Sequence, residues 1–249
     1  MSLPRRVLAL YRRIWQTYRA WFPSLLVLGL VIFLPLGLLD ALVVDVDVDS
    51  LDLGSGIEIA TAAVAVAAIT ATGLLGEVFF SGAITLSLTH PHGEGRPSLR
   101  EISERVEYWR LVVVDIAFVV IVSAGVAVAA VPGILAFVFL SLAGVAVELE
   151  HRTAAGALAR SVQLVRGGFW LAFWVVVPIE LAGEAVGHAV TALVQALLGH
   201  ALLGEWMAEA LSNVVLSPLF AVGAVLLTVE LIAAKDGAAP PLHPTPVPA

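Results

Sequence analysis

The sequence predicts an all-α bundle that crosses a lipid bilayer about six times, as three hairpins that each follow a cytoplasmic interfacial amphipathic helix. The amount of apolar sequence and the placement of basic residues lead to this prediction. The 249 residues are 60% apolar and 13% charged, whereas soluble domains are about half apolar and about a quarter charged. A soluble fold of this length has too few charges to cover so much apolar surface, so we expect lipid to be its solvent.

Six apolar runs are long enough to span a bilayer. They fall at 22–39, 58–88, 110–130, 133–149, 168–190 and 213–234. The second run is longer than one crossing needs and is expected to tilt or protrude, while Val131-Pro132-Gly133 predicts a tight turn before the fourth. We expect a single membrane domain over 1–236 and a disordered Pro-rich cytoplasmic tail over 237–249. The stretch from Leu193 to Leu203 is apolar enough to dip back into the membrane as a re-entrant turn, which is an alternative to a loop outside it.

Basic residues predict the orientation of these spans. All 13 lysines and arginines lie before the first run, between the second and third, between the fourth and fifth, or after the sixth. The charged residues of the remaining connections are all aspartate or glutamate. Because basic segments stay on the cytoplasmic side, we expect a multi-pass protein of the plasma membrane with both termini in the cytoplasm.

Three basic segments have the pattern of amphipathic helices that lead into spans. In the first, arginines lie opposite an apolar face, which is typical of a helix at the lipid surface; they are Arg5, Arg6, Arg12, Arg13 and Arg19. In the second, Ser98 and Glu101 form a capping box, and Thr153 is a candidate cap for the third. Trp21, Trp109 and Trp170 follow the three segments at equivalent points, which indicates a threefold repeat.

Carboxylates within the apolar runs are the candidate functional residues, because a charge at the bilayer centre costs about 2.5–3.5 kcal/mol or more. Glu77 lies in the second run. Glu180, Glu184 and His188 share one face of the fifth at intervals of four residues, beside a Gly183/Gly187 pair that favours close helix packing.

These residues predict either a proton or cation pathway lined by Glu77, Glu180 and Glu184, or a structural role in which Glu180 and Glu184 are held neutral by hydrogen bonds within the bundle or face a wet outer vestibule. Two further acidic residues, Asp115 and Glu230, are expected to have structural roles by reaching interfacial arginines such as Arg110, or water.

Other patterns are weak. The Asp45–Asp52 stretch has acids at alternate positions, but Ser50 stands where a calcium loop needs glycine. His90, His92 and His151 lie near the inner face and are the residue type that binds zinc, but no pattern of second-shell residues supports a zinc site. There is no cysteine, and no cofactor, metal or catalytic motif is predicted. The net charge of −7 argues against nucleic acid as a partner.

Three stretches resemble the membrane domain of bacterial and archaeal glycerophosphoryl diester phosphodiesterases and the related stand-alone six-span proteins. They are GEGRPSLRE at 93–101, VPGI at 131–134 and ALARSVQLVRGGFW at 157–170. The resemblance implies six helices and a membrane location. It does not imply phosphodiesterase activity, because a separate soluble domain carries that chemistry in the family.

Three classes of function follow from these patterns. The favoured one is a non-catalytic membrane module that organises lipids or partner proteins, with membrane lipids, a protein partner or a second copy of the chain as partners. The first alternative is a small transporter or channel that uses the intramembrane carboxylates. The second alternative is a membrane enzyme that acts on a lipid.

Overall fold

The structure, a computed structural model, describes residues 2–41, 76–89, 99–198, 202–237 and 242. Within these ranges all regular secondary structure is helical, which confirms the predicted class. The helices are α1 (Leu3–Ala41), α3 (Glu77–Thr89), α4 (Leu99–Arg105), α5 (Tyr108–Val128), α6 (Ala130–Leu140), α7 (Ala143–Glu150), α8 (Ala154–Leu198) and α9 (Leu202–Asp236). The Asp45–Asp52 acidic stretch, His90, His92, Ser98 and most of the tail lie outside the described residues.

Five helical stretches in the described part are long and apolar enough to cross a membrane. They are Leu3–Leu34, Tyr108–Val128, Ala130–Glu150, Ala154–Leu197 and Ala210–Asp236, and the shorter apolar helix Glu77–Thr89 joins them. This composition suits a helical bundle embedded in a membrane. The count of six spans and their pairing into three hairpins stay predictions.

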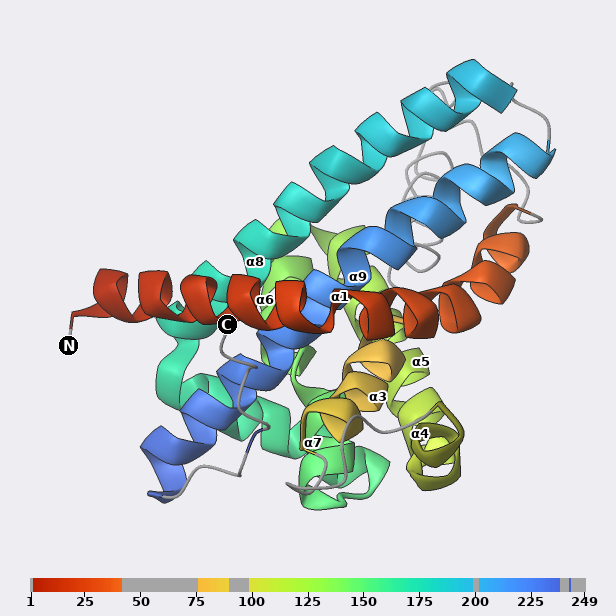
Figure 1. The fold of residues 1–249 in the computed structure, drawn as a ribbon. Coiled ribbons are helices and arrows are strands. Elements are labelled where there is room, and N and C mark those ends of the chain that lie inside the picture. The colour runs from red at the N-terminus through yellow and green to blue at the C-terminus, as the bar shows by residue number, and fades with distance from the viewer. Residues whose placement is uncertain (1, 42–75, 90–98, 199–201, 238–241, 243–249) are drawn as a thin grey trace.

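Helix α9 forms the centre of the bundle. Helices α8 and α1 run along it and α3 packs against a further side, as Figure 1 shows. Small residues in the middle of α9 allow this crowding: Ala221 and Ala224 are at most 1% exposed. A side chain added at Gly223 would come within 3.1 Å of Ile179 on α8. Close packing of this kind holds helices together where lipid removes the hydrophobic force between them.

Helix α1 differs from the prediction of a separate lead-in helix. The amphipathic segment and the first span form one helix of 39 residues, with no break at Trp21. At about 1.5 Å per residue it is about 58 Å long, roughly twice the thickness of a bilayer core. The other two lead-in segments differ again: α4 is separated from α5 by two residues, and α8 bends at Gly168.

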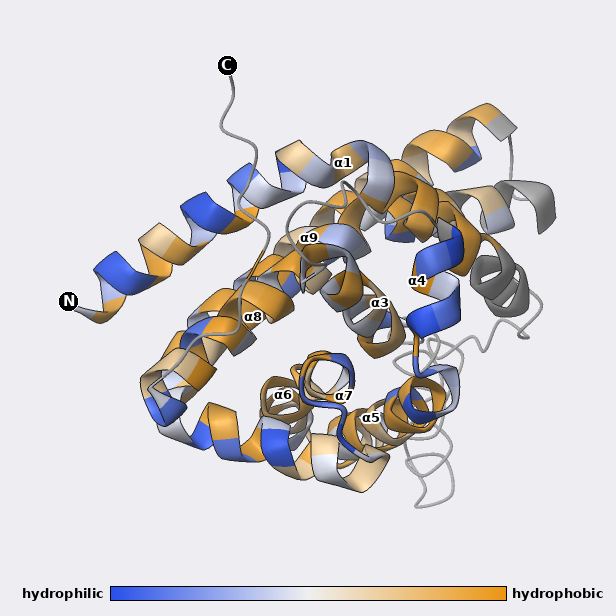
Figure 2. Ribbon diagram, turned by 60° about the horizontal axis from the view of Figure 1, so that its bottom comes forward, coloured by the Kyte–Doolittle hydropathy of each residue, from blue (hydrophilic) through white to orange (hydrophobic). Residues whose placement is uncertain are grey.

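The bend in α8 lies where the backbone of Gly168 leaves the helical conformation, with φ −148° and ψ 37°. A Cβ here would come within 2.5 Å of the end of the Leu231 side chain on α9, so a larger residue would require Leu231 to move. Figure 2 shows the two limbs of α8 running in different directions. Beyond the bend, α8 continues to Leu198 beside α9. Most of the 193–203 stretch, for which the sequence also allows a re-entrant turn, therefore lies in the end of α8 and the start of α9.

The three predicted tryptophan positions are not equivalent in the structure. Trp21 is 4% exposed and faces the bundle, whereas Trp109 is 78% exposed and Trp170 is 60% exposed. The equal spacing in the sequence therefore does not correspond to three equal environments.

The second apolar run is not one continuous helix. Helix α3 begins at Glu77, and the preceding Gly76 has φ 91°, a conformation that glycine adopts without strain. The prediction that 58–88 forms one long helix, tilted or protruding, is therefore wrong at Gly76. Residues 58–75 lie outside the described part of the chain.

The turn between α5 and α6 lies earlier than predicted. Ala129 is extended, and Val131, Pro132 and Gly133 already belong to the first turn of α6, where proline costs no hydrogen bond. A Cβ at Gly133 would lie 2.9 Å from the nitrogen of Val126, so the two helices touch through this glycine. By contrast, a Cβ at Gly183 or Gly187 would meet α9 only at the ordinary contact distances of 3.7–4.0 Å, although the Ser212 hydroxyl of α9 donates to the carbonyl of Gly187 at 3.3 Å.

Candidate functional site

The bundle buries polar side chains at helix ends, and Asp115 on α5 is one of them. Its carboxylate accepts hydrogen bonds from the backbone N–H groups of Gly76 at 2.8 Å, Val78 at 3.0 Å and Phe79 at 3.3 Å. These are donors that a helix start leaves without partners inside the helix. Asp115 therefore caps α3 from another helix, and its negative charge lies at the positive end of the α3 dipole.

The structural role expected for Asp115 is confirmed, but the expected arginine partner is wrong. Arg110 pairs instead with Glu107 at 3.3 Å. The N–H groups at the start of α3 lie beside Asp115 and occupy both of its oxygens. The second expectation, for Glu230, is confirmed: its carboxylate pairs with Arg6 at 3.2 Å and with Arg13 at 3.8 Å.

Two more buried polar residues serve other helix ends. Glu148 on α7 accepts the backbone N–H of Glu107, the residue before α5, at 2.8 Å. Ser161 on α8 bridges the break between α6 and α7, because its hydroxyl donates to the carbonyl of Phe139 at 2.7 Å and accepts from the N–H of Leu142 at 3.3 Å. Sequence reasoning missed both residues. The available signal was a carboxylate or hydroxyl next to an apolar run.

Glu77 is the buried member of the predicted polar site. It is the first residue of α3 and is 6% exposed. One carboxylate oxygen accepts a 2.5 Å hydrogen bond from the hydroxyl of Ser217 on α9, which lies just before Pro218. The other oxygen, Oε2, is buried and has no hydrogen-bond partner among the described residues.

The structure brings Glu180 to Glu77 but leaves the rest of the predicted row outside. Glu180 is half-buried on α8 and lies close enough to Glu77 for their like charges to interact. Glu184 and His188 lie 3.3 Å apart with side chains 69% and 78% exposed. Glu77 and Glu180 are therefore two carboxylates within electrostatic reach of each other, whereas Glu184 and His188 form an ordinary surface contact. Among the described residues, no group of three or more possible metal ligands occurs.

The predicted lipid-surface arginines divide into two sets. Arg6 and Arg13 turn toward the bundle and pair with Glu230 on α9. Arg5, Arg12 and Arg19 are exposed and form no ion pair with described residues; we call them the outer arginine row.

Tyrosine hydroxyls fix this orientation of α1. Tyr11 donates to the carbonyl of Trp174 at 2.8 Å, and Tyr18 donates to the carbonyl of Val215 at 3.0 Å. These bonds hold one side of α1 against α8 and α9, and the side opposite the arginines is buried at Leu10 and Ile14, so the outer arginine row faces away from the bundle.

Comparison with known proteins adds no relative. No protein-family model, no curated protein and no solved structure matches this chain. The functional argument therefore rests on the residues themselves.

Proposed function

We propose that this protein is a non-catalytic membrane module that gathers anionic lipids at the inner leaflet of the plasma membrane. In this proposal it is a stand-alone relative of the six-span membrane domain that its sequence resembles. Six spans are arranged as three hairpins, and both termini are cytoplasmic. The outer arginine row carries the proposal. Its three exposed guanidinium groups share one side of α1, and no carboxylate among the described residues forms an ion pair with them.

The surroundings of the outer arginine row suit the boundary between headgroups and acyl chains. Leu8 and Trp15 follow the same side of α1 and are 63% and 54% exposed. Tryptophan favours this boundary, and arginine stems lie along apolar surface while their heads reach the phosphates. At about 1 kcal/mol for each basic residue near an anionic surface, three arginines favour anionic over neutral lipid by about 3 kcal/mol, or roughly a hundredfold.

The test compares lipid clustering by two sets of arginine substitutions. The purified protein is reconstituted into vesicles of phosphatidylcholine with pyrene-labelled phosphatidylglycerol, and the excimer-to-monomer emission ratio reports clustering. Wild-type protein is expected to raise the ratio. Replacing the outer arginine row by glutamine should abolish the rise, and so should salt near 0.5 M, because screening shortens the reach of exposed charges.

The matched control is Arg6→Gln with Arg13→Gln, on the same helix. This pair is held by Glu230, so its loss is expected to lower stability but to leave clustering intact. Equal clustering by wild type and by the protein without the outer arginine row would rule the proposal out.

A small transporter is the second candidate, and the contact of Glu77 with Ser217 next to Glu180 favours it. A buried carboxylate with one unsatisfied oxygen is costly in a membrane bundle and is typical of an ion or proton pathway. In vesicles that contain a pH-sensitive dye, a transporter should move protons, and Glu77→Gln should stop the movement. Glu184→Gln is the exposed control. Proton movement unaffected by Glu77→Gln would exclude this candidate.

A further inference from the structure

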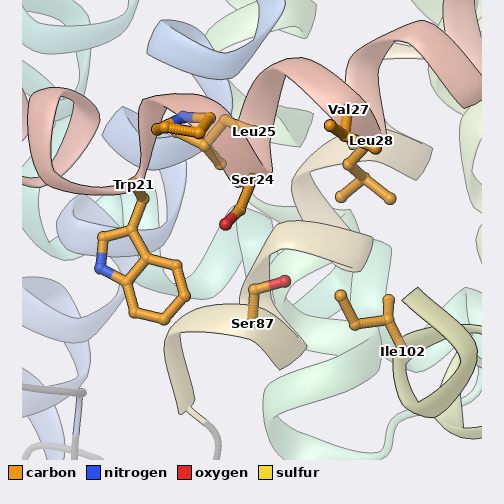
Figure 3. Close-up of a pocket in the computed structure, with 8 residues that line it drawn as sticks. Trp21, Ser24, Leu25, Val27, Leu28, Ser87 and Ile102 are labelled. Atoms are coloured by element: carbon orange, nitrogen blue, oxygen red, sulfur yellow. The ribbon is translucent and has the colours of Figure 1, made fainter. Parts of the chain in front are cut away.

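Two adjoining cavities lie between α1, α3 and α4, and Tyr108 at the start of α5 also lines the larger one. One has a volume of about 480 Å³ and the other about 260 Å³, and both are lined by Leu28 of α1 and Ile102 of α4. Because they share these walls, we treat them as one lateral cleft. In Figure 3, Trp21, Ser24 and Leu28 point from α1 toward Ser87 on α3 and Ile102 on α4.

The walls of the lateral cleft are mostly apolar and reach the outer surface of the bundle. Leu28 and Ile32 form part of the α1 wall, and Ala83 forms part of the α3 wall. Val31 also lines the cleft and is 60% exposed, so the cleft opens sideways where a bilayer surrounds the helices. Water finds few hydrogen-bond partners against such walls, whereas an acyl chain from the bilayer meets a surface of its own kind.

Polar groups gather on the α4 side of the lateral cleft. Arg100 and Ser103 line it there, on a helix that stands out as hydrophilic in Figure 2. The Arg100 side chain is 86% exposed and pairs with Glu104 at 2.8 Å, four residues along the same helix. An exposed pair of this kind contributes little, so the guanidinium can turn to a phosphate, which it binds through two parallel hydrogen bonds.

We propose that the lateral cleft binds one anionic phospholipid of the surrounding bilayer, with an acyl chain along Leu28 and Val31 and its phosphate at Arg100. The shape agrees with this occupant, since an apolar channel runs along α1 and the cationic group lies on α4. This inference deepens the proposed function and rests on its claim that the module works on anionic lipid. It concerns a defined site rather than the outer arginine row.

Photocrosslinking of the full chain tests the site. The protein is placed in phosphatidylcholine nanodiscs that hold a few per cent of phosphatidylglycerol with a diazirine in its acyl chain, irradiated, and mapped by peptide mass spectrometry. Adducts are expected on the α1 and α4 peptides that line the lateral cleft. Val31→Trp fills the cleft from its exposed side and should lower these adducts at least fivefold.

Val120→Trp is the matched control, because Val120 is also 60% exposed but lies on α5 away from the lateral cleft. It should leave the cleft adducts unchanged. Ser103→Phe blocks the cleft from α4 at another exposed position and serves if Val31→Trp fails to fold. Adducts that persist in the blocked variant, or that spread evenly over α6 and α8, would overturn the site in favour of ordinary boundary lipid.

Arg100→Gln tests the headgroup contact separately. It is expected to lower adducts with the phosphatidylglycerol probe several-fold while adducts with a phosphatidylcholine probe stay constant. An equal fall for both probes, or no fall, contradicts a phosphate at Arg100. Arg12→Gln should leave cleft adducts unchanged, so a failure of the outer arginine row in the clustering assay can be told apart from a failure of the lateral cleft.

Discussion

Removing the Asp115 carboxylate should loosen α3 more than its single position suggests. Asp115→Ala leaves three backbone N–H groups without their acceptor, two of them bonded at 2.8 and 3.0 Å and one at 3.3 Å. A hydrogen bond inside a membrane bundle contributes about 0.6–1.7 kcal/mol, and loss of a helix cap costs about 1 kcal/mol. We therefore expect a loss of about 2–4 kcal/mol in the free energy of unfolding.

The assay is SDS-induced unfolding in mixed micelles, followed by circular dichroism. Ser123→Ala is the control on the same helix, because Ser123 is also buried but its hydroxyl has no hydrogen-bond partner among the described residues. It should unfold near the wild-type SDS fraction. Asp115→Asn keeps one acceptor oxygen and should fall between the two.

Hydrogen exchange localises the effect of Asp115→Ala. The amides of Val78 and Phe79 should exchange faster in this variant, since they lose their acceptor, while amides in the middle of α9 should not change. Equal unfolding of Asp115→Ala and Ser123→Ala would refute the argument that Asp115 holds the start of α3.

Two further predictions concern packing and charge elsewhere in the bundle. Gly133→Ala places a methyl group 2.9 Å from the Val126 nitrogen and should lower stability by about 1–3 kcal/mol, measured by the same SDS titration; Gly167→Ala, which meets nothing within 4 Å, should not. Arg160→Met removes a buried guanidinium that pairs with Glu150 and Asp236 and should lower stability by about 1–3 kcal/mol. This is less than the loss expected for a fully buried ion pair, because Asp236 is 41% exposed. Arg152→Met, which removes an exposed partner of the same Glu150, should cost less than about 1 kcal/mol; equal losses for the two arginines would contradict the assigned burial.

Two of the apolar runs predicted helices well. The runs at 110–130 and 213–234 correspond to α5 and to the inner part of α9. This agreement has a local cause, because hydropathy along a run reports directly on whether one helix can be surrounded by lipid. The basic and apolar pattern of α1 also predicted correctly that one side of the helix would be cationic.

Helix breaks were not predictable in the same way. The start of α3 at Glu77 depends on Asp115, which is 38 positions away, and the break after α6 depends on Ser161, about 20 positions away. Backbone groups freed by a break need partners inside a membrane bundle. Whether such partners are present depends on which helices become neighbours, and no local pattern records that.

The candidate polar site shows the same division. Helical spacing placed Glu180, Glu184 and His188 on one helix face, and the 3.3 Å contact between Glu184 and His188 agrees with it. Only the packing of α3 against α9 buried Glu77 beside Ser217 and left Glu184 exposed. Burial is a property of the assembled bundle, so residues of one type received opposite environments.

The sequence by itself determined that the chain is helical and apolar enough for a lipid environment. Both properties follow from composition and from periodicity within single segments. Tertiary structure alone decided where the helices break, which arginines of α1 stay exposed, and where the lateral cleft opens between α1, α3 and α4. The physical reason is that buried hydrogen bonds, ion pairs and cavities join groups far apart in the chain. Their energies exist only once the helices have packed.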